Sequence, residues 1–317
     1  MTNLATGDRH EGAASALQST VPPAASSKVQ APMRRSVAGL WYVTPSLVLL
    51  GVAVVAPIVM SAYYSFTDYS LLRSPSWVGT ENYSRLLVDG GFQRALWQTF
   101  IYTIISVPLQ TVVALVIAAL IARRTRNRFG AFVRSALFIP VIASMIVVGS
   151  VWRYLLATDE GLVNTVLGLF GIPDVNWLGQ PTSALIAVAL VTVWKNVGYF
   201  LVIYYAGMLD IPEDLYEASS IDGAGGIRQF WAITVPSLRP VTLLVVILGT
   251  IWSFQVFDLV YTMTAGGPGG GTVVLVLAIY EAAFQNLQMG YASAIAMVLF
   301  VIIFLASFAQ RVLLRGK

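Results

Sequence analysis

Six long apolar stretches dominate the pattern of the chain after residue 34. They cover approximately residues 40–66, 97–121, 136–156, 184–209, 241–264 and 290–312. Each is close to the roughly 20 residues that an α-helix needs to cross a bilayer. Because backbone N–H and C=O groups in hydrocarbon must be satisfied within the segment, we expect each stretch to be helical. The pattern predicts an all-α integral membrane protein with six transmembrane helices.

The composition supports a lipid-facing protein and leaves little for enzymatic chemistry. Of 317 residues, 57% are hydrophobic and 11% are charged, against roughly 25% charged residues in soluble domains. The chain has no cysteine, which excludes disulfides, thiolate metal sites and cysteine nucleophiles. His10 is the single histidine, so no His–carboxylate metal cluster and no Ser-His-Asp arrangement is expected. We therefore expect no metal site, no cofactor and no enzymatic activity on this chain.

The distribution of Lys and Arg predicts the orientation. With the N-terminus placed in the cytoplasm, the inside segments carry fourteen of the 19 basic residues, and the outside loops with their helix ends carry four. Positive residues are retained on the cytoplasmic side, so both termini should lie inside. Residues 1–34 are rich in Ala, Ser, Thr, Pro and Gln, a composition typical of disorder. We expect a disordered cytoplasmic tail over residues 1–34 and a transmembrane domain over residues 35–317.

One cytoplasmic loop, residues 210–240, departs from the basic bias of the other inside segments. It carries five acids and only two Arg. Asp210 is placed to cap a helix, with Glu213 three residues later as its capping-box partner. Gly223 lets the backbone turn, and a second short helix over 227–233 should end at Pro236. Two short helices joined by a glycine elbow suit insertion into a groove on a cytoplasmic partner.

The same loop contains a spaced motif. Glu217-Ala218-Ser219 is followed after three residues by Gly223, and after nine more residues comes Ile233-Thr234-Val235-Pro236. The string resembles the EAA motif of binding-protein-dependent ABC importer permeases, with Ser219 in place of Ala and Val235 in place of Leu. In that family the loop docks on the ATPase subunit. The resemblance therefore implies an ATPase-coupling role for Glu217, Ala218, Ser219, Asp222, Gly223, Ile233 and Pro236.

Weaker strings, in order along the chain, resemble the carbohydrate-uptake branch of this family, which imports maltose-like sugars, other oligosaccharides and glycerol-3-phosphate. They are Asn82-Tyr83, residues 194–199, residues 206–212, residues 266–268 with Thr272, Tyr280 with Phe284, and residues 290–294. The resemblance implies the type I ABC importer permease fold in a prokaryotic plasma (inner) membrane. It also implies a second permease subunit, two ATPase subunits, an extracytoplasmic solute-binding protein and a sugar substrate.

No phosphate-binding G-x-x-x-x-G-K-[ST] loop occurs in the sequence. ATP and Mg²⁺ are therefore expected on the partner ATPase subunits, whose closure would drive alternating access through the coupling loop.

Polar groups within the predicted spans suggest where a substrate passes. The candidates are Asn196, Trp252, Gln255 and Asp258. On a helix, Gln255 and Asp258 are three residues apart and would share a face. Amide, carboxylate and indole groups suit sugar hydroxyls and ring faces. Gln255 could instead bond between helices. Lys195, costly in mid-span, could serve the substrate or form an ion pair with Asp258.

Two other functions remain open at this point. The six spans could form half of a proton- or sodium-coupled secondary transporter, with Lys195 and Asp258 as ion-coupling groups. The chain could also be an ABC permease for a non-sugar solute, such as amino acids or metal ions.

Overall fold

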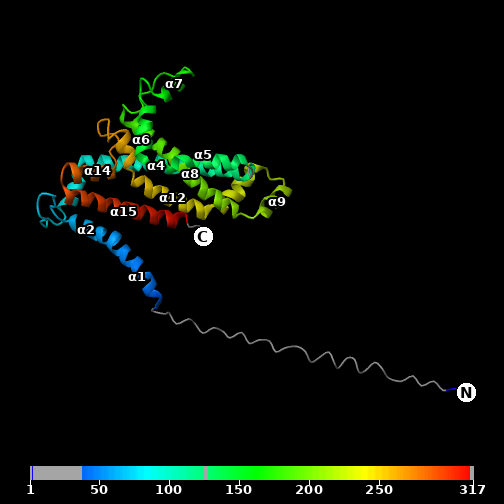
Figure 1. Cartoon of the computed structure of the whole chain (residues 1–317), viewed down its shortest axis with the longest axis horizontal. Coiled ribbons are helices and arrows are strands. Elements are labelled where there is room, and N and C mark those ends of the chain that lie inside the picture. The colour runs from blue at the N-terminus through cyan, green and yellow to red at the C-terminus, as the bar shows by residue number, and fades with distance from the viewer. Residues whose placement is uncertain (1, 3–37, 125–127, 315–317) are drawn as a thin grey trace. The chain divides into compact units, whose positions relative to one another are not determined.

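The computed structural model describes Thr2, residues 38–124 and residues 128–314 (Figure 1). Apart from Thr2, the predicted tail over residues 1–34 lies outside the described residues. The chain divides into two units, residues 1–55 and residues 56–317. The described helices of the first unit are α1 (Ala38–Leu50) and the π-helix η1 (Gly51–Val55).

The second unit holds the remaining elements. In chain order they are α2 (Ala56–Tyr64), α3 (Glu81–Val88), α4 (Gly90–Arg124), α5 (Arg128–Ile142), α6 (Met145–Leu155), α7 (Leu162–Gly168), α8 (Pro181–Leu209), α9 (Glu213–Ile221), α10 (Gly226–Gln229), the π-helix η2 (Phe230–Thr234), α11 (Val235–Ser237), α12 (Arg239–Phe254), α13 (Asp258–Met263), α14 (Leu275–Tyr280), the π-helix η3 (Glu281–Gln285) and α15 (Met289–Leu314). Within the described ranges, β structure is limited to two isolated bridges, Thr67 with Trp77 and Ser70 with Arg73. The all-α prediction is confirmed.

Four of the predicted spans are continuous helices long and apolar enough to cross a membrane. They are Tyr42–Tyr64, Gly90–Ala122, Pro181–Leu209 and Met289–Leu313. The other two are bent pairs, Gly130–Ile142 with Met145–Leu155 at 100° and Gly226–Ser237 with Arg239–Phe254 at 70°. The described residues thus supply up to six spans when each bent pair counts as one.

The predicted third span, residues 136–156, is wrong as a single helix. The helix stops at Ile142, and Ser144 has an extended conformation (φ −59°, ψ 138°) before α6 starts. Pro140 lies in the last turn of α5, where its missing N–H weakens helix continuation. Beyond the bend α6 packs on α13, so tertiary contact stabilises the turn.

The predicted fifth span, residues 241–264, is also interrupted. Helix α12 ends at Phe254, residues 255–257 are not helical, and α13 begins at Asp258. No Gly or Pro occurs in residues 250–264, so no helix-breaking residue marks this interruption in the sequence. Irregular backbone at membrane depth is tolerated where it lines a cavity, which is the case for this break, as described below.

The centre of the second unit is the pair α4 and α8, the most extensive helix contact in the described chain, with α12 packed on α4 and α5 packed on α8. A small residue allows close packing of α8 against α5. An ideal Cβ at Gly198 would lie 2.0 Å from the backbone oxygen of Leu137. Only glycine therefore fits where α8 meets α5.

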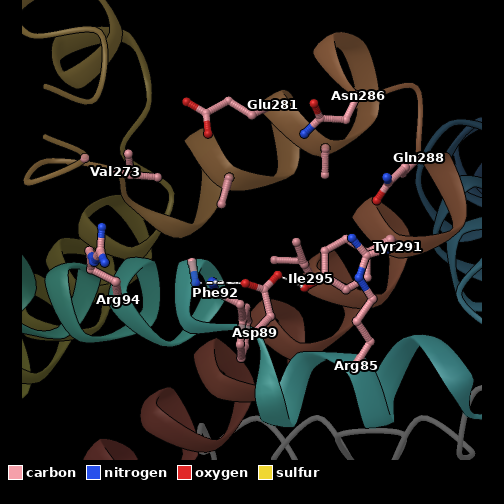
Figure 2. A pocket seen from close by; sticks show the side chains of 14 residues that line it. Arg85, Asp89, Phe92, Arg94, Val273, Glu281, Asn286, Gln288, Tyr291 and Ile295 are labelled. Carbon is pink, nitrogen blue, oxygen red and sulfur yellow. Dashed lines mark hydrogen bonds between the residues drawn. The ribbon is translucent and has the colours of Figure 1, made fainter.

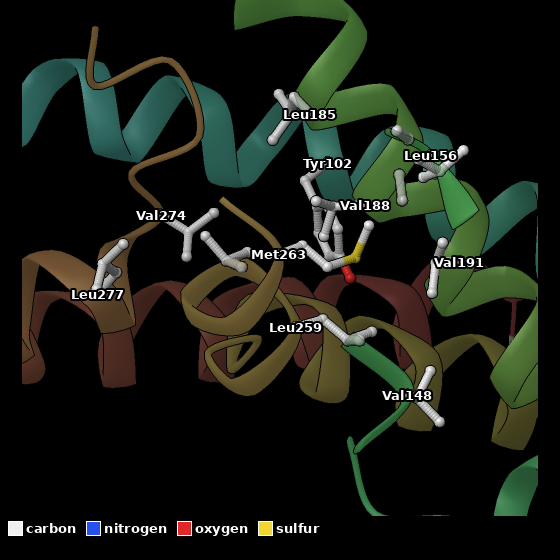
Figure 3. Close-up of a cluster of buried hydrophobic side chains, with 13 residues drawn as sticks. Tyr102, Val148, Leu156, Leu185, Val188, Val191, Leu259, Met263, Val274 and Leu277 are labelled. Atoms are coloured by element: carbon white, nitrogen blue, oxygen red, sulfur yellow. The ribbon is translucent and has the colours of Figure 1, made fainter. Parts of the chain in front are cut away.

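A buried apolar cluster holds the short helices α6 and α13 against α4 and α8 (Figure 3). Its fully buried members include Tyr102 from α4, Val188 from α8, and Leu259 and Met263 from α13. The Tyr102 hydroxyl lies 2.6 Å from Thr192 Oγ1, so the polar end of the ring is satisfied within the core. This packing positions α13 although no continuous helix joins it to α12.

Candidate functional site

The loop at residues 210–240, called the coupling loop below, forms two arms around a glycine elbow. The first arm is α9, with Glu213 and Asp214 in its first turn. At Gly223 the backbone takes φ +78°, a conformation that favours glycine. The predicted elbow is confirmed. The capping prediction is wrong, because Asp210 follows the end of α8 and Pro212 precedes α9 without a side-chain cap bond.

The second arm runs through α10, η2 and α11. The predicted stretch over 227–233 is helical, but it begins at Gly226 and continues to Ser237. Pro236 therefore lies inside α11 and does not end the helix. It directly follows the π-helix η2, where the Val235 N–H donates to the Phe230 carbonyl oxygen five residues back, so the regular i→i−4 hydrogen bonding is already interrupted at this point. The chain then bends at Leu238 into α12.

The motif residues differ in exposure. Glu217, Ala218, Asp222, Gly223 and Pro236 are exposed, while Ser219 and Ile233 are half-buried. Two large apolar side chains stand beside them in solvent, Ile221 at 88% and Ile227 at 81% exposure. Acidic groups with exposed apolar tips form a surface suited to a partner groove.

The four predicted pathway residues line one pocket. Its volume is about 210 Å³, and Asn196, Trp252, Gln255 and Asp258 share its wall with Tyr102 and Thr192 among others. The Trp252 ring packs against two rings of α8, with centroids 5.0 Å from Tyr199 and 5.5 Å from Phe200. An indole held in this way beside amide and carboxylate groups offers a flat apolar face and polar partners in one cavity.

The reason predicted for the proximity of Gln255 and Asp258 is wrong. They do not share a helix face, since Gln255 follows the end of α12 and Asp258 opens α13. Both reach the pocket from the break. Within the described residues Gln255 forms no side-chain hydrogen bond, so it does not tie helices together.

Lys195 is buried, with 5% exposure, and is not among the residues that line this pocket. Its Nζ donates to the backbone oxygen of Val141, 3.2 Å away, near the end of α5. The last carbonyls of a helix lack intrahelical donors and carry partial negative charge. Lys195 therefore satisfies the end of α5, and no ion pair between Lys195 and Asp258 forms in the described structure.

Figure 2 shows a second polar cavity, which lies at the start of α4, whereas the coupling loop lies beside the other end of that helix. Its volume is about 270 Å³, and it lies among the α3–α4 corner, η3 and the start of α15. Arg94 and Glu281 both face it without forming an ion pair in the described chain. Burial raises the pKa of the Glu281 carboxyl above its usual value.

One wall of this cavity, called the outer cavity below because it lies at the far end of α4 from the coupling loop, is a hydrogen-bonded anchor. The Tyr291 hydroxyl and the backbone N–H groups of Gly91 and Phe92 donate to the Asp89 carboxylate. The Tyr291 hydrogen bond is the main cause that lowers the pKa of Asp89. Next to it, Gly290 donates to the Tyr69 carbonyl oxygen at 2.9 Å, and a Cβ there would lie 1.9 Å from the Thr67 oxygen.

Sequence reasoning missed this cavity. Its charged residues are Arg85, Asp89 and Arg94 from one segment and Glu281 from another about 190 residues later, so no spacing pattern brings them together. The one available indication was the string over 290–294, which contains Tyr291.

Comparison with known proteins decides the family. The model of the family described as "Binding-protein-dependent transport system inner membrane component" matches residues 83–317. The chain belongs to this family. The permease is 34% identical over 272 residues to the probable ABC transporter permease protein YurN of Bacillus subtilis, covering 85% of this chain and 93% of that protein.

A second relative of the permease is the trehalose/maltose transport system permease protein MalF of Thermococcus litoralis. The identity is 33% over 272 residues, covering 85% of this chain and 91% of the relative. Among solved structures, a chain of a bacterial ABC transporter involved in the import of the acidic polysaccharide alginate superimposes with a TM-score of 0.77. The match covers 87% of this chain and 95% of that one at 20% identity, so it supports the fold.

These findings identify the chain as a membrane permease subunit of a binding-protein-dependent importer and a prokaryotic inner-membrane component. The alternative of an ion-coupled secondary transporter is wrong.

Proposed function

We propose that the permease imports a sugar through the pocket at the α12–α13 break. The observation that carries the proposal is the convergence of Asn196, Trp252, Gln255 and Asp258 on one cavity. The indole face suits the C–H face of a sugar ring, and the amides and carboxylate suit its hydroxyls. The similarity to MalF, a permease of a trehalose/maltose transport system, supports the same class of solute.

The coupling loop is proposed to receive mechanical work from a separate ATPase. Its exposed acidic and apolar residues suit a groove on such a partner, and Glu217, Ala218, Ser219, Asp222, Gly223, Ile233 and Pro236 carry the contact or shape the loop. ATP and Mg²⁺ then act on the ATPase subunits, and this chain contributes no catalytic group. Displacement of the loop rocks the helices between inward and outward openings.

The proposed assembly contains a second permease, two ATPase subunits and an extracytoplasmic solute-binding protein. The outer cavity with Arg94 and Glu281 lies at the other end of α4 from the coupling loop. If the loop is cytoplasmic, this cavity faces the solute-binding protein, and both chain termini lie in the cytoplasm, as the distribution of Lys and Arg favours.

Transport by the reconstituted complex tests the substrate. The permease, purified with its co-expressed partner subunits, is placed in vesicles with the solute-binding protein and offered maltose, trehalose, glycerol-3-phosphate or methionine. Stimulation of ATP hydrolysis and uptake by a sugar is expected. Stimulation by methionine alone would contradict the proposed substrate class.

Labelling of single cysteines tests the orientation, because the native chain has none. Leu169 and Ile221 are 82% and 88% exposed. With a membrane-impermeant maleimide on intact cells, Leu169→Cys should react at once, and Ile221→Cys only after the membrane is opened. The reverse order would place the coupling loop outside.

A further inference from the structure

The first arm of the coupling loop stands apart from the helix bundle. Within the described residues, α9 has no extensive helix–helix contact with any other element. A cavity of about 460 Å³ lies beside it, and its lining includes Ala122 of α4, Met208 of α8, Tyr216 of α9 itself, and Gln229 and Thr234 of the second arm. The Tyr216 ring reaches the buried cluster beneath, but most of α9 is exposed.

The covalent link between the two arms is compliant. It passes through Gly223, Gly225 and Gly226, and ideal Cβ atoms at Gly223 and Gly225 would meet nothing within 4 Å. Glycine samples more backbone conformations than any other residue. A hinge of this kind, without other connections, would absorb a displacement of α9 and would not pass it to α12.

Gln229 bridges the arms from inside. It is 9% exposed, and its Nε2 donates to the backbone oxygen of Tyr216 at 3.2 Å and to Ser220 Oγ at 2.8 Å. One amide of α10 thereby binds two successive turns of α9. Both hydrogen bonds are partly buried, since Ser220 is exposed and Gln229 also lines the cavity beside α9. Because one amide bonds α9 at two positions, the bridge still fixes the separation of the arms and limits movement at the elbow.

A second bridge lies farther along the second arm. The Tyr216 hydroxyl is 2.9 Å from Oγ1 of Thr234, which is 2% exposed. Thr234 ends η2, directly before α11 and α12. The substrate pocket lies at the far end of α12, where Trp252 and Gln255 line it. A connection therefore runs from α9 through these bridges, around the 70° bend at Leu238 and along α12 to the pocket.

We propose that Gln229 is a positioning residue that makes α9 and α12 move as one body. It lies outside the spaced motif and inside the loop, and it acts through Tyr216 and Ser220 without touching the ATPase. This inference rests on the proposed coupling role of the loop and deepens it. Docking is assigned to the exposed residues of α9, and transmission to the buried amide behind them.

Spin labels test the rigid-body claim directly. Cysteines replace Ile221 on α9 and Leu244 on α12, both exposed, in the otherwise cysteine-free chain of the assembled complex. With the native Gln229, the distance distribution should be narrow and equal with and without ATP. In Gln229→Met, which keeps the length of the side chain and removes both donors, the distribution should broaden. An unchanged width in a correctly assembled complex would overturn the proposal.

Measurements of ATPase binding and of solute transported per ATP hydrolysed distinguish a role in transmission from a role in docking. Gln229→Met should still bind the ATPase, while solute transported per ATP hydrolysed falls several-fold. Ser220→Ala removes one acceptor and should give a smaller loss, and it should add nothing in the Gln229→Met background because both act on one bridge. The matched control is Gln285→Met, an exposed glutamine in η3, which should behave as wild type.

Two variants distinguish failure of the Gln229 bridge from failure of the coupling role of the loop. Normal coupling in Gln229→Met, with loss of coupling in Gly223→Pro, rejects the bridge and leaves the coupling role standing. Normal coupling in both variants rejects the coupling role as well. Loss of ATPase binding in Gln229→Met would assign the residue to docking or folding and also reject the bridge.

Discussion

The coupling loop and the break at residues 255–257 lie at opposite ends of α12, and different forces hold them. The loop turns at glycines and is stabilised by a few side-chain bridges over an open cavity. The break has no glycine or proline and is held by buried apolar packing of α13. The glycines specify the turn in the coupling loop, whereas the packing of α13 specifies the break at residues 255–257.

This difference also separates their tasks. In the proposed function the exposed side chains of the coupling loop contact an ATPase, so the shape of the loop must be retained while its surface stays accessible. The inner break directs Gln255 and Asp258 into a pocket, so it must keep irregular backbone away from lipid. Mutations should therefore act through conformation at the loop and through packing or contact at the break.

The largest effect is expected at the elbow. Proline cannot adopt the φ of +78° at Gly223, so Gly223→Pro should abolish uptake while the protein remains inserted and ATP hydrolysis becomes independent of solute. Uptake and ATPase assays on vesicles measure this. Alanine should be milder, costing about 1–2 kcal/mol in a left-handed conformation.

Gly225→Ala is the matched control, since Gly225 has φ −70° and open space around its Cβ position. It should transport normally. Wild-type uptake by a correctly inserted Gly223→Pro protein would count against the coupling role.

The next effect concerns packing at the inner break. A Cβ at Gly149 would lie 1.9 Å from Thr262 Oγ1 and 2.9 Å from Thr262 Cβ on α13. Gly149→Ala should therefore displace α13 and reduce stability by about 1–3 kcal/mol, as overpacking does elsewhere. Thermal unfolding of the purified complex measures the loss. Gly168→Ala, with nothing near its Cβ position, should leave the melting temperature unchanged, and an equal loss in both variants would contradict the packing argument.

A smaller change is expected from the pocket wall. Trp252→Leu removes the flat face while Tyr199 and Phe200 remain. The solute concentration for half-maximal uptake should rise about tenfold, which corresponds to about 1.4 kcal/mol, with ATPase binding unaffected. Trp97→Leu, at an exposed indole of α4 outside this pocket, provides the comparison. Equal effects of the two changes would argue against a substrate role for Trp252.

The smallest effect should come from the outer anchor, remote from both interruptions. Tyr291→Phe removes a hydrogen bond to Asp89 and should cost about 1 kcal/mol of stability, without changing solute transported per ATP. The bond lowers the pKa of Asp89 below 3.8. Its stabilisation is therefore complete above the ordinary pKa and is lost as pH falls through the lowered one.

Melting temperatures of wild type and Tyr291→Phe should accordingly differ by a constant amount from pH 8 to 5 and converge only below about pH 4. A gap that closes near neutral pH would assign the effect to another group.

Periodicity and motif spacing were sufficient for the helical class, the approximate spans and the elbow at Gly223, because these depend on local hydrophobicity and backbone preference. They failed at Ser144, where Pro140 and packing of α6 on α13 together bend the chain, and at residues 255–257, where packing of α13 bends apolar chain without Gly or Pro. Apolar runs look alike in sequence whether they are straight or broken.

The candidate site shows the same division. The type of residue identified Trp252, Gln255 and Asp258, although their proximity comes from the break and not from helical spacing. Lys195 was misjudged because its partner is a backbone carbonyl, and carbonyls have no signature in sequence. The Gln229 bridge was missed because it depends on how two arms fold together.

The pinned start of α15 limits how that helix is able to move. Gly290 has no clearance from the 67–69 backbone, and Tyr291 is bonded to Asp89. Sliding of α15 along its axis would disrupt both contacts, so a movement that keeps them must be a tilt about this end. A helix of 26 residues is about 39 Å long, so each degree of tilt carries its free end about 0.7 Å sideways. A tilt of a few degrees about the start of α15 therefore moves the other end of this helix by several tenths of an ångström to a few ångströms.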